Sequence, residues 1–354
     1  MLFQTMNKRG APTRAVLSRT LGITAAAIAL ALVATGCSAS TNGAGGGSSD
    51  KNYKITFLPK NLGNAYFDTS DKGGEKAIKE FKGTYKEVGP AAATADAQVS
   101  YINTLTQQNV GAIVLSANDP TALGSALTQA RSNKVKIVTF DSDTDAKYRD
   151  IFINQATAEG IAKIQVGLIT KQIGDTGEVA ILSAAANATN QNAWIELMKK
   201  DLAADHPNVK LVDTVYGNDD DQTSFDKTAA LLQTHPNLKG IISPTTVGIA
   251  SAARYLSTST FKGKVALTGL GTPNQMRDYV NDGTVTAFAL WNPADLGYLA
   301  SYAAKALIDG TITGKEGDSF TAGTLGTFKV GANGTVLLGD PFTFDKSNIA
   351  TFKF

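Results

Sequence analysis

Five short segments of this chain combine planar amides, carboxylates, hydroxyls, one cation and aromatic rings. Carboxylates and amides can each make two hydrogen bonds to neighbouring hydroxyl groups, and aromatic faces cover the C–H side of a sugar ring. This mixture of groups predicts a binding site for a neutral polyol. The candidate residues in these segments are Lys60, Asn64, Tyr66, Phe67, Asp141, Asn190, Gln191, Pro244, Thr246, Trp291 and Asn292.

Each candidate also has a plainer structural interpretation. Lys60 could be an exposed charge at a strand end, and Asp141 could cap a loop. The remaining polar candidates could belong to helix starts, and the aromatic ones could pack in the core or at a hinge. Of the neighbouring residues, Trp194 fits a core position as well as a site, and Thr245 fits a helix cap.

Other chemistries find little support in the sequence. The chain has two histidines, His206 and His235, each in a His-Pro-Asn segment typical of a helix end, so no Ser-His-Asp set is expected. The run 218–221 lacks the alternating ligands of a calcium loop and predicts a solvated helix cap instead. We therefore expect no enzyme activity, no cofactor and no metal. The net charge is +2 and no stretch of the sequence is strongly basic, so nucleic acid is not expected as a partner.

Strand and helix patterns alternate along the chain and would position these groups. A helix face through Ala77, Ile78 and Phe81 follows the first strand, and another helix is predicted to begin at Asn118-Asp119-Pro120. Nearly continuous apolar strands alternating with helices predict parallel sheets covered on both faces. In such sheets ligands bind outside the carboxyl ends of the strands, where the candidate residues lie. The predicted strands are 55–59, 112–115, 135–140, 178–182, 209–215, 240–242, 264–268 and 285–290.

The alternation pauses between about 141 and 155, resumes with a helix over 158–173, and weakens into short strands after Gly310. This pattern predicts two similar α/β halves, with a chain that recrosses between them.

The first 36 residues predict a secretory signal. A basic leader precedes an apolar run over 21–33, and small residues then lead to Cys37, the only cysteine. This place looks like the lipid-modified first residue of a bacterial lipoprotein, although Ala34 stands where leucine is usual. The alternative is a leader that merely contains a cysteine. The Gly/Ser-rich stretch that follows predicts a flexible tether over 37–52, so we expect a protein held outside the cytoplasm by lipid on Cys37.

Seven segments in order resemble one family. The chain is similar to the periplasmic-binding-protein-like (type I) sugar-binding proteins of ABC importers, in the ribose-binding branch, and closest to rhamnose-binding proteins and autoinducer-2 receptors. The matching segments are ITFLPKNLGNAYF, TFDSDT, FINQAT, NQNAW, GIISPTT, TPNQMRDYV and FALWN. The resemblance implies two doubly wound lobes joined by three hinge crossovers. The ranges we expect are 53–145 with 292–322 for the first lobe, and 146–291 with 323–354 for the second.

Carried over by position, the family's ligand contacts fall on Lys60, Asp141, Asn190, Gln191, Pro244 and Thr246. Two of them depart from the autoinducer-2 pattern, which has aspartate at Asn190 and alanine at Thr246. Exchanging a carboxylate for an amide adds donors and removes charge, so the hydroxyl pattern of the ligand is expected to differ. The Asn-Gln-Asn form is associated with the rhamnose group. L-Rhamnose is therefore the first expectation, and autoinducer-2 the second.

The resemblance also implies partners, namely an ABC permease with its ATPase, and we expect a monomer. A sensory receptor would use the same lobes, and a secreted sugar enzyme would need an acid–base pair or metal set. A DNA-binding sugar repressor would need a helix-turn-helix where this chain has its leader.

Overall fold

The computed structural model describes residues 51–354. The predicted signal, the lipid site at Cys37 and most of the predicted tether lie outside these residues. Within 51–354 no helix combines the length and the apolar character that a membrane span requires.

A six-stranded parallel sheet forms the centre of the first lobe, in the order β13-β5-β4-β3-β1-β2. Its inner strands are buried along nearly their whole length, as expected for a sheet covered on both faces. The strands are β1 (Lys54–Leu58), β2 (Thr84–Glu87), β3 (Ala112–Leu115), β4 (Lys136–Phe140), β5 (Ile151–Asn154) and β13 (Thr335–Leu337).

Alternate side chains of these strands enter two cores. Phe57 and Val114 belong to the core that includes helices α1 (Ala65–Glu80) and α9 (Pro293–Asp309). Leu58 and Leu115 belong to the other core, with α2 (Ala95–Gln107) and α3 (Gly124–Ser132). The period of two along each strand thus divides its side chains between two helical layers.

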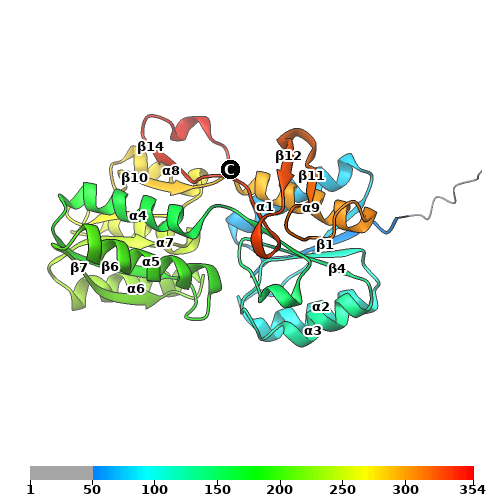
Figure 1. The fold of residues 1–354 in the computed structure, drawn as a ribbon. Helices are drawn as coiled ribbons and strands as arrows, with labels where there is room; N and C mark the ends of the chain where they lie inside the picture. Colours follow the sequence, from blue (N-terminus) through cyan, green and yellow to red (C-terminus); the bar gives the residue numbers. More distant parts are fainter. Residues whose placement is uncertain (1–50) are drawn as a thin grey trace, which may run out of the picture. The chain divides into compact units, whose positions relative to one another are not determined.

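A four-stranded parallel sheet, in the order β7-β6-β8-β9, forms the centre of the second lobe. Helices surround this sheet (Figure 1). Its elements are α4 (Ala158–Ile173), β6 (Gly177–Ser183), α5 (Thr189–Asp205), β7 (Val209–Tyr216), α6 (Asp221–Thr234), β8 (Leu238–Ser243), α7 (Thr246–Thr258), β9 (Ala266–Gly269) and α8 (Pro273–Asn281).

Two short strand pairs complete the described chain. Strand β10 (Ala287–Leu290) pairs antiparallel with β14 (Phe342–Asp345), and a bridge from Leu270 to Ala289 joins β10 to the second sheet. Strands β11 (Ser319–Thr321) and β12 (Thr327–Lys329) form a hairpin.

The chain passes between the lobes three times: between β5 and α4, between β10 and α9, and between β13 and β14. The predicted lobe ranges differ from this pairing, because they assign β5 and β13 to the second lobe. Both strands are only three or four residues long and lie directly before a crossover. Their short apolar runs therefore do not show which of the two sheets they join.

The α/β fold with parallel sheets is confirmed, and one predicted helix start is wrong. Helix α3 begins at Gly124 and not at 118–120. Asp119 Oδ1 instead accepts the backbone N–H groups of Thr121 and Ala122, at 2.8 Å each, and so holds a separate turn before the helix. The two histidines do stand at helix ends, since His206 and His235 are the C-cap residues of α5 and α6.

Candidate binding pocket

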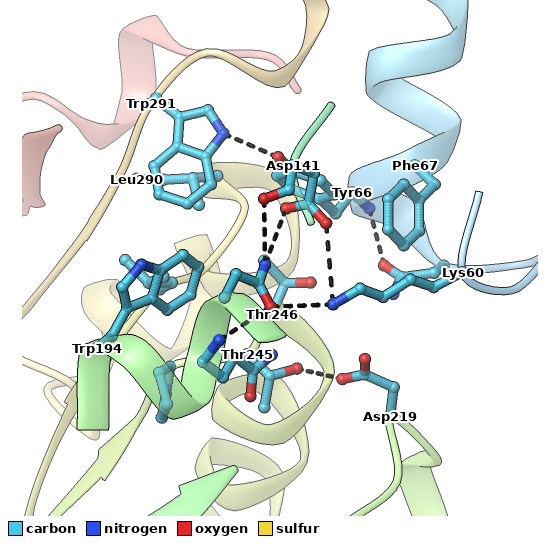
Figure 2. A pocket seen from close by; sticks show the side chains of 15 residues that line it. Lys60, Tyr66, Phe67, Asp141, Trp194, Asp219, Thr245, Thr246, Leu290 and Trp291 are labelled. Carbon is cyan, nitrogen blue, oxygen red and sulfur yellow. Dashed lines mark hydrogen bonds and ion pairs between the residues drawn. The ribbon is translucent and has the colours of Figure 1, made fainter. Parts of the chain in front are cut away.

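One pocket collects residues from the carboxyl ends of strands in both sheets, as drawn in Figure 2. About 360 Å³ of space not filled by atoms, including open solvent, lies within it. Every predicted site residue except Asn292 lines it. The lining residues are Lys60, Asn64, Tyr66, Phe67, Asp141, Asn190, Gln191, Trp194, Asp219, Pro244, Thr245, Thr246, Leu270, Leu290 and Trp291.

Asp141 lies directly after β4 and carries the negative charge of the first-lobe wall. Its φ of 61° is uncommon for a residue other than glycine, and such strain collects at functional sites. Ser116 Oγ donates to Asp141 Oδ2 at 2.7 Å, and Lys60 Nζ lies 3.9 Å from the same oxygen. Burial raises the pKa of Asp141, whereas the Lys60 charge acts in the opposite direction.

Lys60 is buried although it is a lysine, with 4% of its surface exposed. Its Nζ donates to Asn190 Oδ1 at 3.1 Å, across from the first lobe to the second. Buried amides fix the backbone behind it. Asn118 Nδ2 donates to the Lys60 carbonyl at 2.9 Å, and Gln98 Nε2 donates to the carbonyls of Pro59 and Ser116. The ammonium is therefore presented by a rigid strand end.

Asn190 and Gln191 occupy the first turn of α5 and use their amides differently. Asn190 Nδ2 faces Asp141, 3.4 Å from its carbonyl oxygen and 3.5 Å from Oδ1. Gln191 Oε1 accepts from Ser183 Oγ at 2.6 Å and from the Ala184 N–H at 2.8 Å. The oxygen of Gln191 is thus already occupied within its own lobe. Its amide nitrogen is the group left to contact a ligand, as a hydrogen-bond donor.

Aromatic rings form the apolar wall. Trp291 Nε1 donates to the Tyr66 hydroxyl at 2.9 Å, and the rings of Trp291 and Trp194 lie edge to face with centroids 6.2 Å apart. Burial raises the pKa of Tyr66 well above its usual value, so this hydroxyl stays protonated. Leu270 and Leu290 add aliphatic surface to the pocket.

The start of α1 places two further lining residues. Asn64 is the N-cap of this helix, and its Oδ1 accepts the Tyr66 N–H at 3.1 Å. The ring of Phe67 packs edge to face on those of Tyr66 and Phe140. Both residues thus have a structural role in the first lobe as well as a place in the lining.

Asp219 was missed at the sequence level, where the run 218–221 indicated only a solvated cap. The cap prediction holds for Asp220, whose side chain accepts the Thr223 N–H at the start of α6. Asp219 instead lines the pocket and accepts a hydrogen bond from Thr245 Oγ1. Its place shortly after β7 is a signal that could have revealed it, because ligands bind near the carboxyl ends of parallel strands. None of the five candidate segments lies at the end of this strand.

Asn292 is not brought to the pocket. Its Oδ1 accepts the Ala294 N–H at 3.0 Å, and its Nδ2 donates to Asp295 Oδ2 at 2.8 Å. The side chain therefore caps α9, which begins with Pro293. Asn292 was a candidate because it follows a predicted strand end together with Trp291, and the cap accounts for its polar side chain.

The pocket offers one ammonium, two carboxylates, amide and hydroxyl groups, and aromatic faces. Neither histidine lines it: His206 contacts Asp175, and His235 contacts Asp213. In the described range 51–354 no group of three or more histidine, cysteine or acidic residues could hold a metal ion. The arrangement suits recognition of several neighbouring hydroxyl groups.

Comparisons with known proteins agree with this geometry. The family model described as a periplasmic binding protein domain matches residues 55–312. A solved sugar ABC transporter structure from Actinomyces odontolyticus is 50% identical, covering 87% of this chain and 100% of that chain, with a TM-score of 0.69.

Two further solved structures contain ligands. An ABC transporter solute-binding protein from Clostridium phytofermentas with bound L-rhamnose is 39% identical, covering 84% of this chain and 97% of that chain, with a TM-score of 0.80. LsrB from Clostridium saccharobutylicum in complex with AI-2 is 28% identical, covering 85% and 99%, with a TM-score of 0.81.

Proposed function

We propose that this chain, which belongs to the periplasmic binding protein domain family, captures a neutral monosaccharide outside the cytoplasm and delivers it to an ABC permease. It is a sugar-binding component of an ABC transporter, and members of this family bind solutes without being enzymes. The family is extracytoplasmic.

The observation that carries the proposal is the meeting of groups from both lobes in one pocket. Lys60 and Asp141 come from the first sheet, and Asn190 joins them from α5 of the second lobe. A sugar held between such groups would stabilise the closed arrangement of the lobes, because it interacts with both at once. Ligand occupancy would then shift the population towards the form that a permease recognises.

L-Rhamnose is the proposed ligand. The relative solved with bound L-rhamnose is 39% identical to this chain, whereas the one solved with AI-2 is 28% identical. The amide of Asn190 and the hydroxyl of Thr246 favour a hydroxyl pattern other than that of autoinducer-2. Leu270 and Leu290, beside the tryptophans, offer apolar surface for the methyl group of a 6-deoxy sugar. Autoinducer-2 remains the second candidate, for import or sensing, because of the likeness to LsrB.

Calorimetric titration of the purified protein with L-rhamnose, autoinducer-2, D-ribose and D-arabinose tests the ligand. We expect saturable one-to-one binding that is tightest for L-rhamnose. Tightest binding of autoinducer-2 would move the assignment to the second candidate. Failure of every sugar to bind, together with no retained sugar in native mass spectrometry, would overturn the proposal.

The membrane attachment is a separate proposal. Lipid on Cys37 would hold the protein at the membrane, with the residues up to 52 as a tether to a monomeric sugar-binding body. A Cys37→Ser variant should be released into the medium or periplasm while its sugar affinity is unchanged. Equal membrane retention of Cys37→Ser and the unaltered protein would contradict the lipid anchor.

A further inference from the structure

Asp219 belongs to a tightly defined loop at the end of β7. Gly217 and Asn218 donate backbone hydrogen bonds to the carbonyls of Ser183 and Ala184, at 2.8 and 2.9 Å, and so continue the ladder with β6. Asn218 and Asp219 then adopt φ values of 56° and 50° in succession. Asparagine and aspartate tolerate the left-handed region better than other residues with a side chain, but two of them in succession are uncommon and define the conformation of this loop.

This conformation brings the Asp219 carboxylate into the pocket, where Figure 2 shows it beside Thr245 and below Lys60. One carboxylate oxygen, Oδ1, accepts from Thr245 Oγ1. The Lys60 charge is close enough to act on the Asp219 carboxyl, although burial has the larger effect and raises the pKa of that carboxyl. The pocket therefore holds Lys60 together with two carboxylates, Asp141 from the first lobe and Asp219 from the second.

We infer that Asp219 is a specificity-determining residue of the pocket, whose second carboxylate oxygen accepts a hydrogen bond from one hydroxyl group of the bound sugar. This inference rests on the proposed function, because it assigns a ligand contact within the sugar pocket. An ionised carboxylate is an acceptor only, so it favours a hydroxyl at that point and disfavours a group that cannot donate. A sugar that carries its own carboxylate would be repelled by the pair of aspartates.

A purely structural role makes a different prediction. If Asp219 served only to hold Thr245 and the start of α7, removing either end of their hydrogen bond would have the same effect. Every ligand would also be affected alike. The analogues of L-rhamnose that each lack a different hydroxyl separate these two roles, because only a direct contact singles out one hydroxyl.

The test compares Asp219→Asn and Thr245→Val with the unaltered protein, and uses Asp220→Asn as the matched control. Asp220 is the adjacent carboxylate but caps α6, a role that asparagine also fills. Calorimetric titrations would use L-rhamnose and its monodeoxy analogues. We expect Asp219→Asn to weaken L-rhamnose binding about tenfold or more, since a charge-assisted hydrogen bond is lost. Asp220→Asn should bind as the unaltered protein does.

The monodeoxy analogues decide the role. For one of them the loss caused by Asp219→Asn should largely disappear, because that analogue lacks the hydroxyl that Asp219 accepts. An equal loss for all analogues, or no loss for L-rhamnose while the unaltered protein binds it, would overturn the inference and leave the proposed function standing. Absence of sugar binding by the unaltered protein would instead overturn the proposed function, and the inference with it.

Discussion

The two halves of the pocket are built differently. The first-lobe half carries a buried ion pair, Lys60 and Asp141, that is fixed from behind by side chains of its own lobe. The second-lobe half is neutral except for Asp219, and Asn190 reaches from it to both members of that pair. The first-lobe, charged half thus supplies preorganised groups that interact strongly with hydroxyls, and the second-lobe half, here called the neutral half, supplies amide and hydroxyl groups that can select among ligands.

The largest effect is expected from neutralising the charged half. Asp141→Asn keeps the shape and tolerates the left-handed backbone, but it removes the negative partner of buried Lys60. We expect L-rhamnose binding to weaken about a hundredfold, measured by calorimetry. Asp145→Asn is the control, because Asp145 lies in the same loop, pairs with Lys147 and does not line the pocket. Comparable losses in both variants would contradict a special role for Asp141.

A smaller effect is expected from the neutral half. Asn190→Asp would place a third carboxylate in the pocket, with an oxygen about where Asn190 Nδ2 now lies, 3.5 Å from Asp141 Oδ1. Like charges at this distance should weaken L-rhamnose binding about tenfold and favour the second candidate ligand, autoinducer-2. Asn192→Asp is the control, since Asn192 lies on the same helix and does not line the pocket. If Asn190→Asp had the same ligand preference as the unaltered protein, the neutral half would not select among ligands, which would contradict this account.

A stability prediction concerns α1, behind the charged half. Asp71 is 1% exposed, and burial together with the Glu87 carboxylate raises its pKa well above the usual value. Between its unfolded and folded pKa values the folded protein holds a proton that the unfolded chain has lost. Raising the pH through this window therefore lowers the free energy of unfolding.

Asp71→Asn should remove this fall in the free energy of unfolding with rising pH. It should therefore stabilise the sugar-free protein near neutral pH by about 1 kcal/mol or more. Thermal unfolding across about pH 4 to 8 measures it, with Asp96→Asn, an exposed carboxylate in the first turn of α2, as the control. A variant whose melting temperature falls with pH as steeply as that of the unaltered protein would contradict the explanation.

The smallest effect is expected where the chain crosses between the halves. Trp291→Phe removes the hydrogen bond to Tyr66 but keeps most of the apolar wall, so sugar binding should weaken only about threefold. Trp194→Phe is the comparison, because it trims a neighbouring ring of the pocket wall. A loss in Trp291→Phe as large as that in Asp141→Asn would mean that the aromatic wall, and not the ion pair, dominates binding.

The sequence predicts the pocket well where a strand pattern is strong. Lys60 and Asp141 follow buried apolar strands, so the rule for carboxyl ends places them at one edge. The prediction fails at Asp219. In the polar run 218–221 the sequence does not show that Asp219 enters the pocket whereas Asp220 caps a helix. Asn292 shows the opposite error, because a capping side chain resembles a ligand contact.

The pairing of distant strands and the apolar part of the pocket lining are harder to infer from the sequence. The strands β5 and β13 are too short to show a pattern, and only their pairing reveals that they belong to the first sheet. Leu270 and Leu290 line the pocket, yet aliphatic residues at strand ends have no signal that separates them from the core.

The two tryptophans of the chain both line the pocket, so their fluorescence reports on the central claim directly. Titration with L-rhamnose should change the tryptophan emission in a saturable way, with the same affinity that calorimetry gives. The change should occur at about hundredfold higher sugar concentration in Asp141→Asn. Calorimetric binding of the sugar without any change in emission, and with equal affinity in Asp141→Asn, would show that the sugar binds elsewhere and contradict this account.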